Sequence, residues 1–451
     1  MPFNTQNFIF VFLPFLILSY YLAGDRLKNG IILIYSILFY VIGNYRNPEN
    51  IVILATLMLI NYVFGFYIIK MRKEKERYVK YILIFSIIFN VLVLCFFKSQ
   101  LFVKILPLGI SFYVFHFISI LLDSYKSSFD DKEFNFFNYI NYILFFPKIL
   151  SGPITRYGYY VSEYKNKNQN KNIIQGIYYF AIGLALKCLL SNNISYIINQ
   201  INVYGFESIS IGTAWIGMYS YTMSLYFDFA GYSLMAIGLA NIIGMNLPNN
   251  FDLPFCSKSV SEFWRRWHIS LGHFFREYIY IPLGGNCGNK NLFRQCVNLG
   301  IVWLVTGFWH GFKMNYILWA MLICIIIIIE KIFLIKFYKK HEIVGRIIVC
   351  LLMPFAFLIF SIENLSNLQV YISRLFALSS INQARDLQVI LPLYGKIFVV
   401  GIIFMTKYPK IIMNIVAKNK VLMIIVSIAL IILSAYMINV SSVDTFKYFT
   451  F

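Results

Sequence analysis

Apolar runs recur from one end of the chain to the other, and short polar loops separate them. A helix needs roughly 17 to 25 mainly apolar residues to cross the hydrocarbon core of a membrane. The pattern therefore predicts an all-α polytopic protein with about a dozen transmembrane or re-entrant helices. The clearest runs are 8–21, 31–42, 51–69, 81–97, 105–122, 174–190, 211–229, 297–312, 316–335, 347–361, 389–405 and 421–438.

The first run, at residues 8–21, lacks the features of a cleavable signal peptide. The residues before it, MPFNTQN, carry no Lys or Arg, and no small-residue cleavage pattern follows the run. Further apolar runs come directly after it. We therefore expect this run to be the first membrane helix of the chain.

The composition agrees with a membrane protein. Of the 451 residues, 59% are hydrophobic and only 13% are charged. One water-soluble core cannot bury so much apolar surface, so lipid must cover a large part of it, which excludes a soluble enzyme. The 7 cysteines show neither a disulfide framework nor metal-ligand spacing, and we interpret them as small buried hydrophobic residues.

The formal net charge of +20 follows from where the basic residues lie. Lys and Arg gather in alternate loops, at 26–28, 70–80, 126–171, 258–294, 336–346 and 407–420. By the positive-inside rule these loops are cytoplasmic, which places both termini and the loop 362–388 on the outer side. An anionic lipid surface or an acidic donor is the alternative explanation of the charge. Nucleic acid, which such a charge suggests for a soluble chain, is not expected as a partner.

The strongest candidate for a functional segment runs from Asp252 to Asn286 and reads DLPFCSKSVSEFWRRWHISLGHFFREYIYIPLGGN. Ser259 with Glu262 three residues later is a capping-box signature, so a helix is expected to begin near Ser259. At helical spacing one face carries Ser261, Arg265, His268 and Gly272, and another carries Trp264, Trp267, Leu271 and Tyr278. Such a helix would lie at the membrane interface or dip into it. An ordinary amphipathic interfacial helix is the alternative.

A second candidate is His310, in the run Thr306 to Gly311 that reads TGFWHG. It lies roughly 20 Å along the apolar run that begins at residue 297, deep in the membrane and toward the outer side. Gly307 and Gly311 form a small-xxx-small pair beside it, which permits close approach of a helix or a substrate. Histidine is suited to take a proton from a hydroxyl at neutral pH, although a hydrogen bond to a neighbouring helix is the structural alternative.

Other polar residues in apolar surroundings carry weaker signals. Asp228 needs a partner, and an Arg or His of the segment 252–286 is a candidate. Pro147 and Pro153 bracket a break after residue 139, which suggests a re-entrant element. A structural role is favoured for both places. No metal is expected, because His268 and His273 are too far apart around a helix to chelate together.

The chain resembles the membrane-bound O-acyltransferase family through its longest motifs. These are the SVSEFWRRWHISL and YIYIPLGGN runs of the segment 252–286 and WLVTGFWHG at 303–311, with further matches at 1–21, 106–116, 151–157 and 226–238. The resemblance is to the bacterial branch of alginate, peptidoglycan and cellulose acetylating proteins and of D-alanyl transferases. It implies one membrane domain over 1–451, a ring of helices around a thin centre, with a motif segment at 252–294 and a catalytic helical hairpin at 297–335.

The resemblance also implies catalytic roles for both histidines. His310 would be the general base on an attacking hydroxyl, and His268 would orient or stabilise the thioester carbonyl or the departing thiolate. The other expected site residues line the channel and exclude water or hold polar groups: Ser261, Trp264, Arg265, Trp267, Trp309 and Asp228. Arg265 and Arg266 are candidates for holding a phosphate of the donor, although surface anchoring explains them equally well.

The expected reaction moves a short acyl group, most simply acetyl, from a cytoplasmic thioester to an extracytoplasmic hydroxyl of a cell-envelope polysaccharide. Acetyl-CoA and an acylated carrier protein are both candidate donors, and no bound cofactor is expected. An extracytoplasmic partner, itself an acyltransferase or esterase-like protein, would relay the group to the glycan. We expect the protein in the bacterial inner membrane, in contact with lipid.

Two alternatives remain open from the residues alone. Ser233, Leu234 and Met235 stand closer to the D-alanyl transferases, whereas the N-terminal opening and the run 280–286 stand closer to the acetylating proteins. A transporter with a path lined by His, Arg and Asp228 is the alternative from another class. It predicts broken helices at matching positions of two halves, a symmetry that the sequence does not show.

Overall fold

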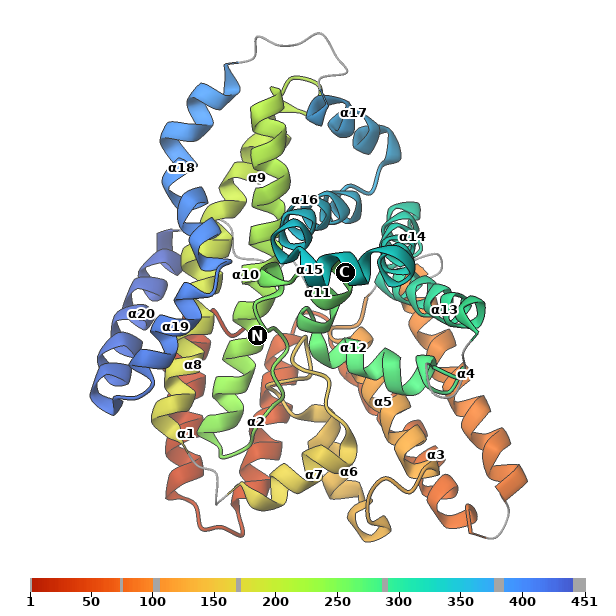
Figure 1. The fold of residues 1–451 in the computed structure, drawn as a ribbon. Helices are drawn as coiled ribbons and strands as arrows, with labels where there is room; N and C mark the ends of the chain where they lie inside the picture. The colour runs from red at the N-terminus through yellow and green to blue at the C-terminus, as the bar shows by residue number, and fades with distance from the viewer. Residues whose placement is uncertain are drawn as a thin grey trace. The chain divides into compact units, whose positions relative to one another are not determined.

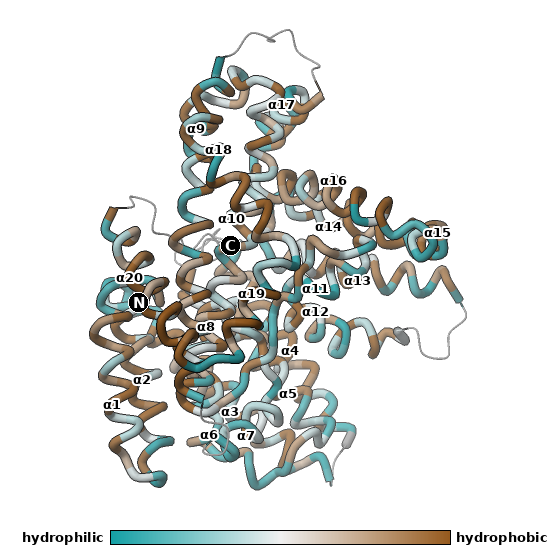
Figure 2. The backbone as a smooth tube through the Cα atoms, turned by 60° about the vertical axis from the view of Figure 1, so that its left-hand side comes forward, coloured by the Kyte–Doolittle hydropathy of each residue, from teal (hydrophilic) through white to brown (hydrophobic). Residues whose placement is uncertain are grey.

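The structure, a computed structural model, describes residues 2–73, 76–99, 106–167, 172–285, 291–376 and 385–440. Within these ranges the regular structure is helical and no strand occurs, as the hydropathy pattern predicts. Each predicted apolar run falls mainly within a helix. Figure 2 shows hydrophobic residues along most of α1 (Leu13–Leu22) and α2 (Lys28–Gly43), with hydrophilic residues near their ends.

Fewer helices than the expected dozen are long enough to cross a membrane. Among the described residues, 9 helices are long and apolar enough to cross a membrane. Three further apolar helices, at Phe8–Leu22, Lys28–Gly43 and Ile110–Tyr125, are 10–17 residues long. These three account for the difference from the expected number, because apolar composition without sufficient length does not establish a span.

The chain divides into two compact units, and the first comprises residues 1–184, 232–249 and 426–428. Its helices after α1 and α2 are α3 (Glu49–Met71), α4 (Glu76–Ser99), α5 (Ile110–Tyr125), α6 (Phe136–Leu144), α7 (Tyr157–Asn166) and most of α8 (Ile173–Ala185). After α6 the chain turns through Pro147 and Pro153, which confirms the predicted break. Lys148 is fully buried in this turn, where its Nζ donates to Thr155 Oγ1 at 3.1 Å.

The second unit comprises residues 185–231, 250–425 and 429–451 and contains both predicted catalytic histidines. Its helices are α9 (Asn192–Tyr204), α11 (Val260–Arg266), α12 (Ile269–Phe275), α13 (Leu292–His310), α14 (Met314–Ile329), α15 (Ile335–Lys340), α16 (Glu342–Ser361), α17 (Leu365–Leu375), α18 (Asp386–Phe404), α19 (Tyr408–Val416) and most of α20 (Lys420–Val440). The helix α10 (Ile211–Ile242) contributes residues to both units.

The predicted hairpin at 297–335 is formed by α13 and α14, which lie side by side (Figure 1). Gly307 is at the contact, since a Cβ at this position would lie 3.1 Å from Ala320 Cβ and 3.1 Å from Tyr316 O. The small residues beside His310 therefore permit the close approach of a helix, one of the two outcomes that the sequence left open. This packing fixes the end of α13, where His310 is the last helical residue.

Candidate active site

The segment around His268 folds as two short helices rather than one. Helix α11 ends at Arg266, Trp267 is extended, and His268 adopts a left-handed conformation with φ 44° before α12 begins. The continuous helix with two separate faces was therefore a wrong expectation. Because the chain bends at His268, residues from both expected faces line one cavity. A left-handed backbone is uncommon outside glycine and persists only where the surroundings hold it.

The start of α11 carries the predicted cap. Ser259 accepts a hydrogen bond from Glu262 N–H at 3.0 Å, which confirms that the helix begins there. The Glu262 carboxylate accepts from Lys258 N–H at 2.9 Å, one residue earlier than in the standard capping box. Arg266 also pairs with Glu262, at 2.7 Å. The short helix is thus fixed by its own polar residues.

Glu330, in the turn that directly follows α14, forms hydrogen bonds to the start of α11. It is 1% exposed and sits on a π-helical turn, Glu330–Leu334. Its carboxylate accepts from Val260 N–H at 2.7 Å and from both Ser261 N–H and Ser261 Oγ at 2.8 Å. A carboxylate at a helix N-terminus satisfies amide groups that have no partner within the helix. The Ser261 hydroxyl is therefore engaged as a donor.

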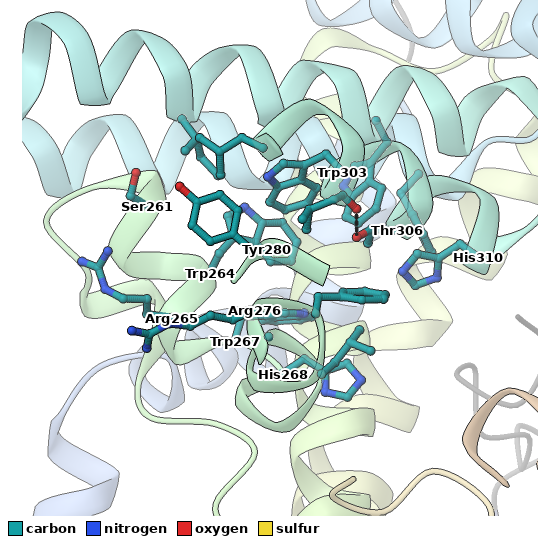
Figure 3. A pocket seen from close by; sticks show the side chains of 18 of the residues that line it. Ser261, Trp264, Arg265, Trp267, His268, Arg276, Tyr280, Trp303, Thr306 and His310 are labelled. Atoms are coloured by element: carbon teal, nitrogen blue, oxygen red, sulfur yellow. Dashed lines mark hydrogen bonds between the residues drawn. The ribbon is translucent and has the colours of Figure 1, made fainter. Parts of the chain in front are cut away.

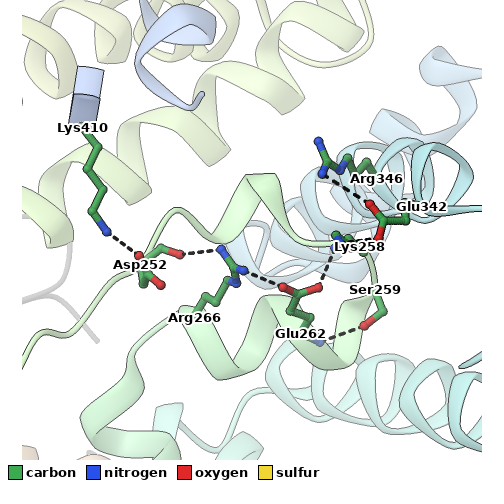
Figure 4. A network of polar contacts seen from close by, with 8 residues as sticks. All are labelled: Asp252, Lys258, Ser259, Glu262, Arg266, Glu342, Arg346 and Lys410. Carbon is green, nitrogen blue, oxygen red and sulfur yellow. Dashed lines mark hydrogen bonds and ion pairs between the residues drawn. The ribbon is translucent and has the colours of Figure 1, made fainter. Parts of the chain in front are cut away.

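A polar network joins the segment 252–266 to α16 and α19 (Figure 4). Asp252 pairs with Lys410 at 2.6 Å, and this hydrogen bond lowers the pKa of the Asp252 carboxyl. Lys258 pairs with Glu342 of α16. Arg266 belongs to this network through Glu262 and does not line the cavity described below. The contacts of Arg266 are thus with the polar residues of its own segment.

Asn250 and aromatic rings surround His268, which is 4% exposed. Its Nδ1 lies 3.0 Å from Asn250 Oδ1. The ring of Phe229 meets the imidazole edge to face, with centroids 4.6 Å apart, and Trp309 lies 6.5 Å away. Burial lowers the pKa of His268 to about 3, so the side chain is neutral at physiological pH.

His310 is 9% exposed and is enclosed by aromatic rings from three helices. Its ring centroid lies 4.8 Å from Phe360 of α16, 5.2 Å from Trp319 of α14 and 4.5 Å from the neighbouring Trp309. Trp309 thus contacts both imidazoles. Edge-to-face packing of this kind restricts the orientation of the ring and keeps water away from it.

Both histidines line one cavity of about 460 Å³, which we name the aromatic cavity. Figure 3 shows the two imidazoles on one side of it and Ser261 and Arg265 on the other. The volume falls within the range of sites for small ligands. The residues that line the aromatic cavity include Ser261, Trp264, Arg265, Trp267, His268, Arg276, Tyr280, Trp303, Thr306, His310, Trp319, Lys331, Phe357 and Phe360.

Two expected site residues do not line the aromatic cavity. Trp309 lies beside it, against both histidines, and Asp228 is fully buried elsewhere in the second unit. Asp228 pairs with Lys187 at 2.6 Å, so the expectation that an Arg or His of the segment 252–286 would be its partner was wrong. Lys187 is 1% exposed, and a buried carboxylate close to an ammonium group is a structural arrangement.

Sequence reasoning missed Lys187, Glu330, Arg276, Lys331 and Asn250. Lys187, Arg276, Glu330 and Lys331 lie on π-helical turns at Leu186–Ser191, Arg276–Tyr280 and Glu330–Leu334. Such turns often occur at functional sites, but hydropathy does not reveal them. The available signal was a charge in the middle of an apolar run, which applies to Lys187 and Glu330.

The described residues contain no group of three or more His, Cys, Asp or Glu side chains that would hold a metal ion. Six cysteines in those ranges are free thiols, and Cys287 lies outside them. The lining of the aromatic cavity offers two imidazoles, indole and phenol rings, the hydroxyl groups of Ser261 and Thr306, and basic side chains.

Comparison with known proteins places these features in a family. The model of the membrane-bound O-acyltransferase family matches residues 32–368. A probable alginate O-acetylase of Pseudomonas aeruginosa is 33% identical over 341 residues, which are 71% of this chain and 64% of the relative. A peptidoglycan O-acetyltransferase of Helicobacter pylori is 31% identical over 422 residues, 81% of this chain and 78% of the relative.

A teichoic acid D-alanyltransferase of Bacillus subtilis is 30% identical over 248 residues, 52% of this chain and 61% of that protein. The match thus spans less than two thirds of the alginate and teichoic acid relatives. The family match covers the region that holds α11 to α14, both histidines and the aromatic cavity. The chain belongs to the membrane-bound O-acyltransferase family.

Proposed function

We propose that the protein is an acyltransferase that uses the aromatic cavity to pass a short acyl group, acetyl in the first instance, from a thioester to a hydroxyl. The observation that carries the proposal is the convergence of His268 and His310 on one cavity with basic side chains on its lining. The family match supports the class of reaction.

In the proposed reaction His310 acts as general base. The imidazole takes the proton of the attacking hydroxyl, whose oxygen forms a bond to the thioester carbonyl carbon. The C–S bond then breaks, and the departing thiolate receives the proton from the imidazolium. The products are an ester and a free thiol, so protons and electrons balance without a cofactor. Phe360 and Trp319 around His310 exclude water that would otherwise hydrolyse the thioester.

The donor would enter with its phosphate toward Arg265, Arg276 and Lys331. These side chains line the aromatic cavity, and Arg265 lies on the side opposite the imidazoles (Figure 3). Guanidinium groups bind phosphate through paired hydrogen bonds. The walls between the two sides are apolar and aromatic, formed by Trp264, Trp303 and Phe357 among others. A phosphopantetheine arm carries an acyl thioester at one end and a phosphate at the other, in coenzyme A and in a carrier protein alike.

We propose acetyl transfer ahead of D-alanyl transfer because the longer matches are to acetylating proteins. The peptidoglycan relative aligns over 81% of this chain, whereas the teichoic acid relative aligns over 52%. The acceptor hydroxyl would belong to an envelope polysaccharide or to a partner protein that relays the group. The basic loops would face the cytoplasm in the bacterial inner membrane, so donor and acceptor would approach from opposite sides.

The test compares cell-envelope glycans from cells with and without the protein, analysed by mass spectrometry for bound esters. Cells that lack the protein should lose one ester, and its mass distinguishes acetyl from D-alanyl. Wild-type protein should restore this ester. His310→Ala should reduce it at least about 100-fold, the usual scale for loss of a general base.

The matched control is His341→Ala, since His341 is exposed and does not line the aromatic cavity. This variant should restore the ester to the wild-type level. Membrane insertion and abundance of both variants are checked by immunoblot and by size-exclusion chromatography. A His310→Ala protein that is inserted at the normal level and restores the full ester would contradict the proposed base.

A further inference from the structure

One side-chain oxygen, Asn250 Oδ1, contacts several polar groups of the turn that carries His268. It lies 3.0 Å from His268 Nδ1, accepts from Ser270 Oγ at 3.0 Å and accepts from Ser270 N–H at 3.3 Å. The Asn250 main-chain oxygen accepts from Ile269 N–H at 2.9 Å. Asn250 is 1% exposed, so these contacts form away from solvent.

These contacts determine which ring nitrogen of His268 carries the proton. A main-chain N–H is always a donor, so the Asn250 atom that faces Ser270 N–H must be the amide oxygen. The orientation of the amide group is therefore fixed by the backbone and not by the histidine. An oxygen can only accept, so His268 Nδ1 must be the donor. In a neutral imidazole this leaves Nε2 without a proton and with a lone pair.

We propose that Asn250 is a positioning residue that holds His268 as the neutral tautomer protonated at Nδ1, so that Nε2 serves as a hydrogen-bond acceptor. The inference rests on the proposed function, because the reactant beside His268 would be the thioester donor or the acceptor hydroxyl. It assigns His268 the task of orienting an O–H or N–H group of that reactant. His310 remains the group that carries the proton.

The assignment differs from the role that the resemblance suggested for His268. An unprotonated Nε2 cannot donate a hydrogen bond to a thioester carbonyl or to a thiolate. The left-handed backbone of His268 and the aromatic contacts from Phe229 of α10 and Trp309 of α13 hold the ring in place. The low pKa of the imidazole agrees with an orienting acceptor, because so weak a base accepts a hydrogen bond without removing the proton.

A spectroscopic measurement tests the tautomer without acyl transfer. The chain has 5 histidines, so ¹⁵N-histidine labelling of the whole protein in detergent gives few signals, and His268→Gln identifies those of His268. The wild-type protein should show the neutral tautomer with the proton on Nδ1. Asn250→Ala should show a mixture of tautomers. A wild-type His268 protonated at Nε2, or at both nitrogens at pH 7, would overturn the proposal whatever the reaction of the protein.

Kinetics test the same assignment through a charge change. Asn250→Asp keeps an acceptor oxygen for His268 and Ser270 but adds a negative charge, which stabilises the imidazolium and raises the pKa of His268. In the wild type His268 stays neutral, so it produces no loss of rate between pH 5 and 8. In Asn250→Asp the rate should fall as pH falls through the raised pKa and recover at higher pH. The titratable groups on the same cavity are His310, Arg265, Arg276, Tyr280 and Lys331, and all are unchanged in the variant.

Asn250→Ala should lower kcat about 10- to 100-fold with KM for the donor within about twofold, as is typical when a residue that orients a catalytic imidazole is removed. The matched control is Ser270→Ala, which removes the other side-chain donor to the same oxygen. It should keep the wild-type rate and pH profile. A folded Asn250→Asp protein with the wild-type pH profile would contradict the positioning role, as would a Ser270→Ala protein as impaired as Asn250→Ala.

Discussion

The two arginines at positions 265 and 266 are neighbours in sequence but have different surroundings. Arg265 lines the aromatic cavity, whereas Arg266 pairs with Glu262 and contacts the Asp252 main-chain oxygen. The RRW motif itself did not separate them, because a residue's side of a short helix depends on where that helix ends. The sequence thus shows that both residues are charged, but it does not show which partner each one contacts.

This difference predicts opposite kinetic effects at the two positions. Arg265→Gln should raise KM for the thioester donor about tenfold, the scale of one charge-assisted hydrogen bond, with a smaller effect on kcat. The effect should decrease at high salt, which screens an exposed charge. Steady-state kinetics with the purified protein, over a range of ionic strength, measures both.

Arg266→Gln is the matched control for this prediction. It should leave KM for the donor within about twofold and lower stability only slightly, because partly exposed ion pairs contribute roughly 0 to 1 kcal/mol. Equal increases in KM for both variants would mean that the basic residues act through the net charge of the segment. The proposed phosphate contact at Arg265 would then be wrong.

The pair of short helices α11 and α12 depends on an element that is distant in sequence. Sequence reasoning located the cap at Ser259, because capping is a local pattern, and the structure confirms it. It predicted one helix where two occur, because the break at His268 has no Pro or Gly signal. Glu330, which accepts from Val260 and Ser261, was missed since its partners are 69 and 70 residues away.

Removing the Glu330 carboxylate should loosen α11. Glu330→Gln keeps one side-chain oxygen as an acceptor but replaces the other with an NH₂ group, which cannot accept from the N–H that faces it. We expect a loss of about 1 to 3 kcal/mol for the buried donor left without an acceptor. Hydrogen exchange should increase at residues 259–268 more than elsewhere, and the thermal midpoint of the purified protein should fall.

Glu363→Gln provides the control for Glu330→Gln. Glu363 pairs with Lys313 on the surface, where the Glu363 side chain is 52% exposed. Its substitution should change the thermal midpoint very little, since such pairs are weak. If the two substitutions lowered the midpoint equally, or if exchange at 259–268 stayed at the wild-type rate in Glu330→Gln, the anchoring role of Glu330 would be refuted.

For the whole molecule, the sequence predicted the fold class and the family better than it predicted the number of spans. Hydropathy predicts helices well in a membrane protein, because every backbone group in lipid must be satisfied within its own segment. It does not settle whether short apolar helices such as α2 cross the membrane. It also does not predict that Lys187 and Asp228 form a buried pair, because the two residues come from different helices. The orientation in the membrane rests on the positions of the basic loops and remains part of the proposal.

The most direct test of the central proposal is transfer by purified protein in liposomes with donor and acceptor on opposite sides. Acetyl-coenzyme A carrying a labelled acetyl group is supplied on the side of the basic loops, and a hydroxyl acceptor glycan is sealed on the other. We predict labelled ester on the acceptor and release of free thiol with wild-type protein, and neither with His310→Ala. Ester that forms only when donor and acceptor share one side, or no consumption of any acyl thioester, including an acylated carrier protein, would contradict the account.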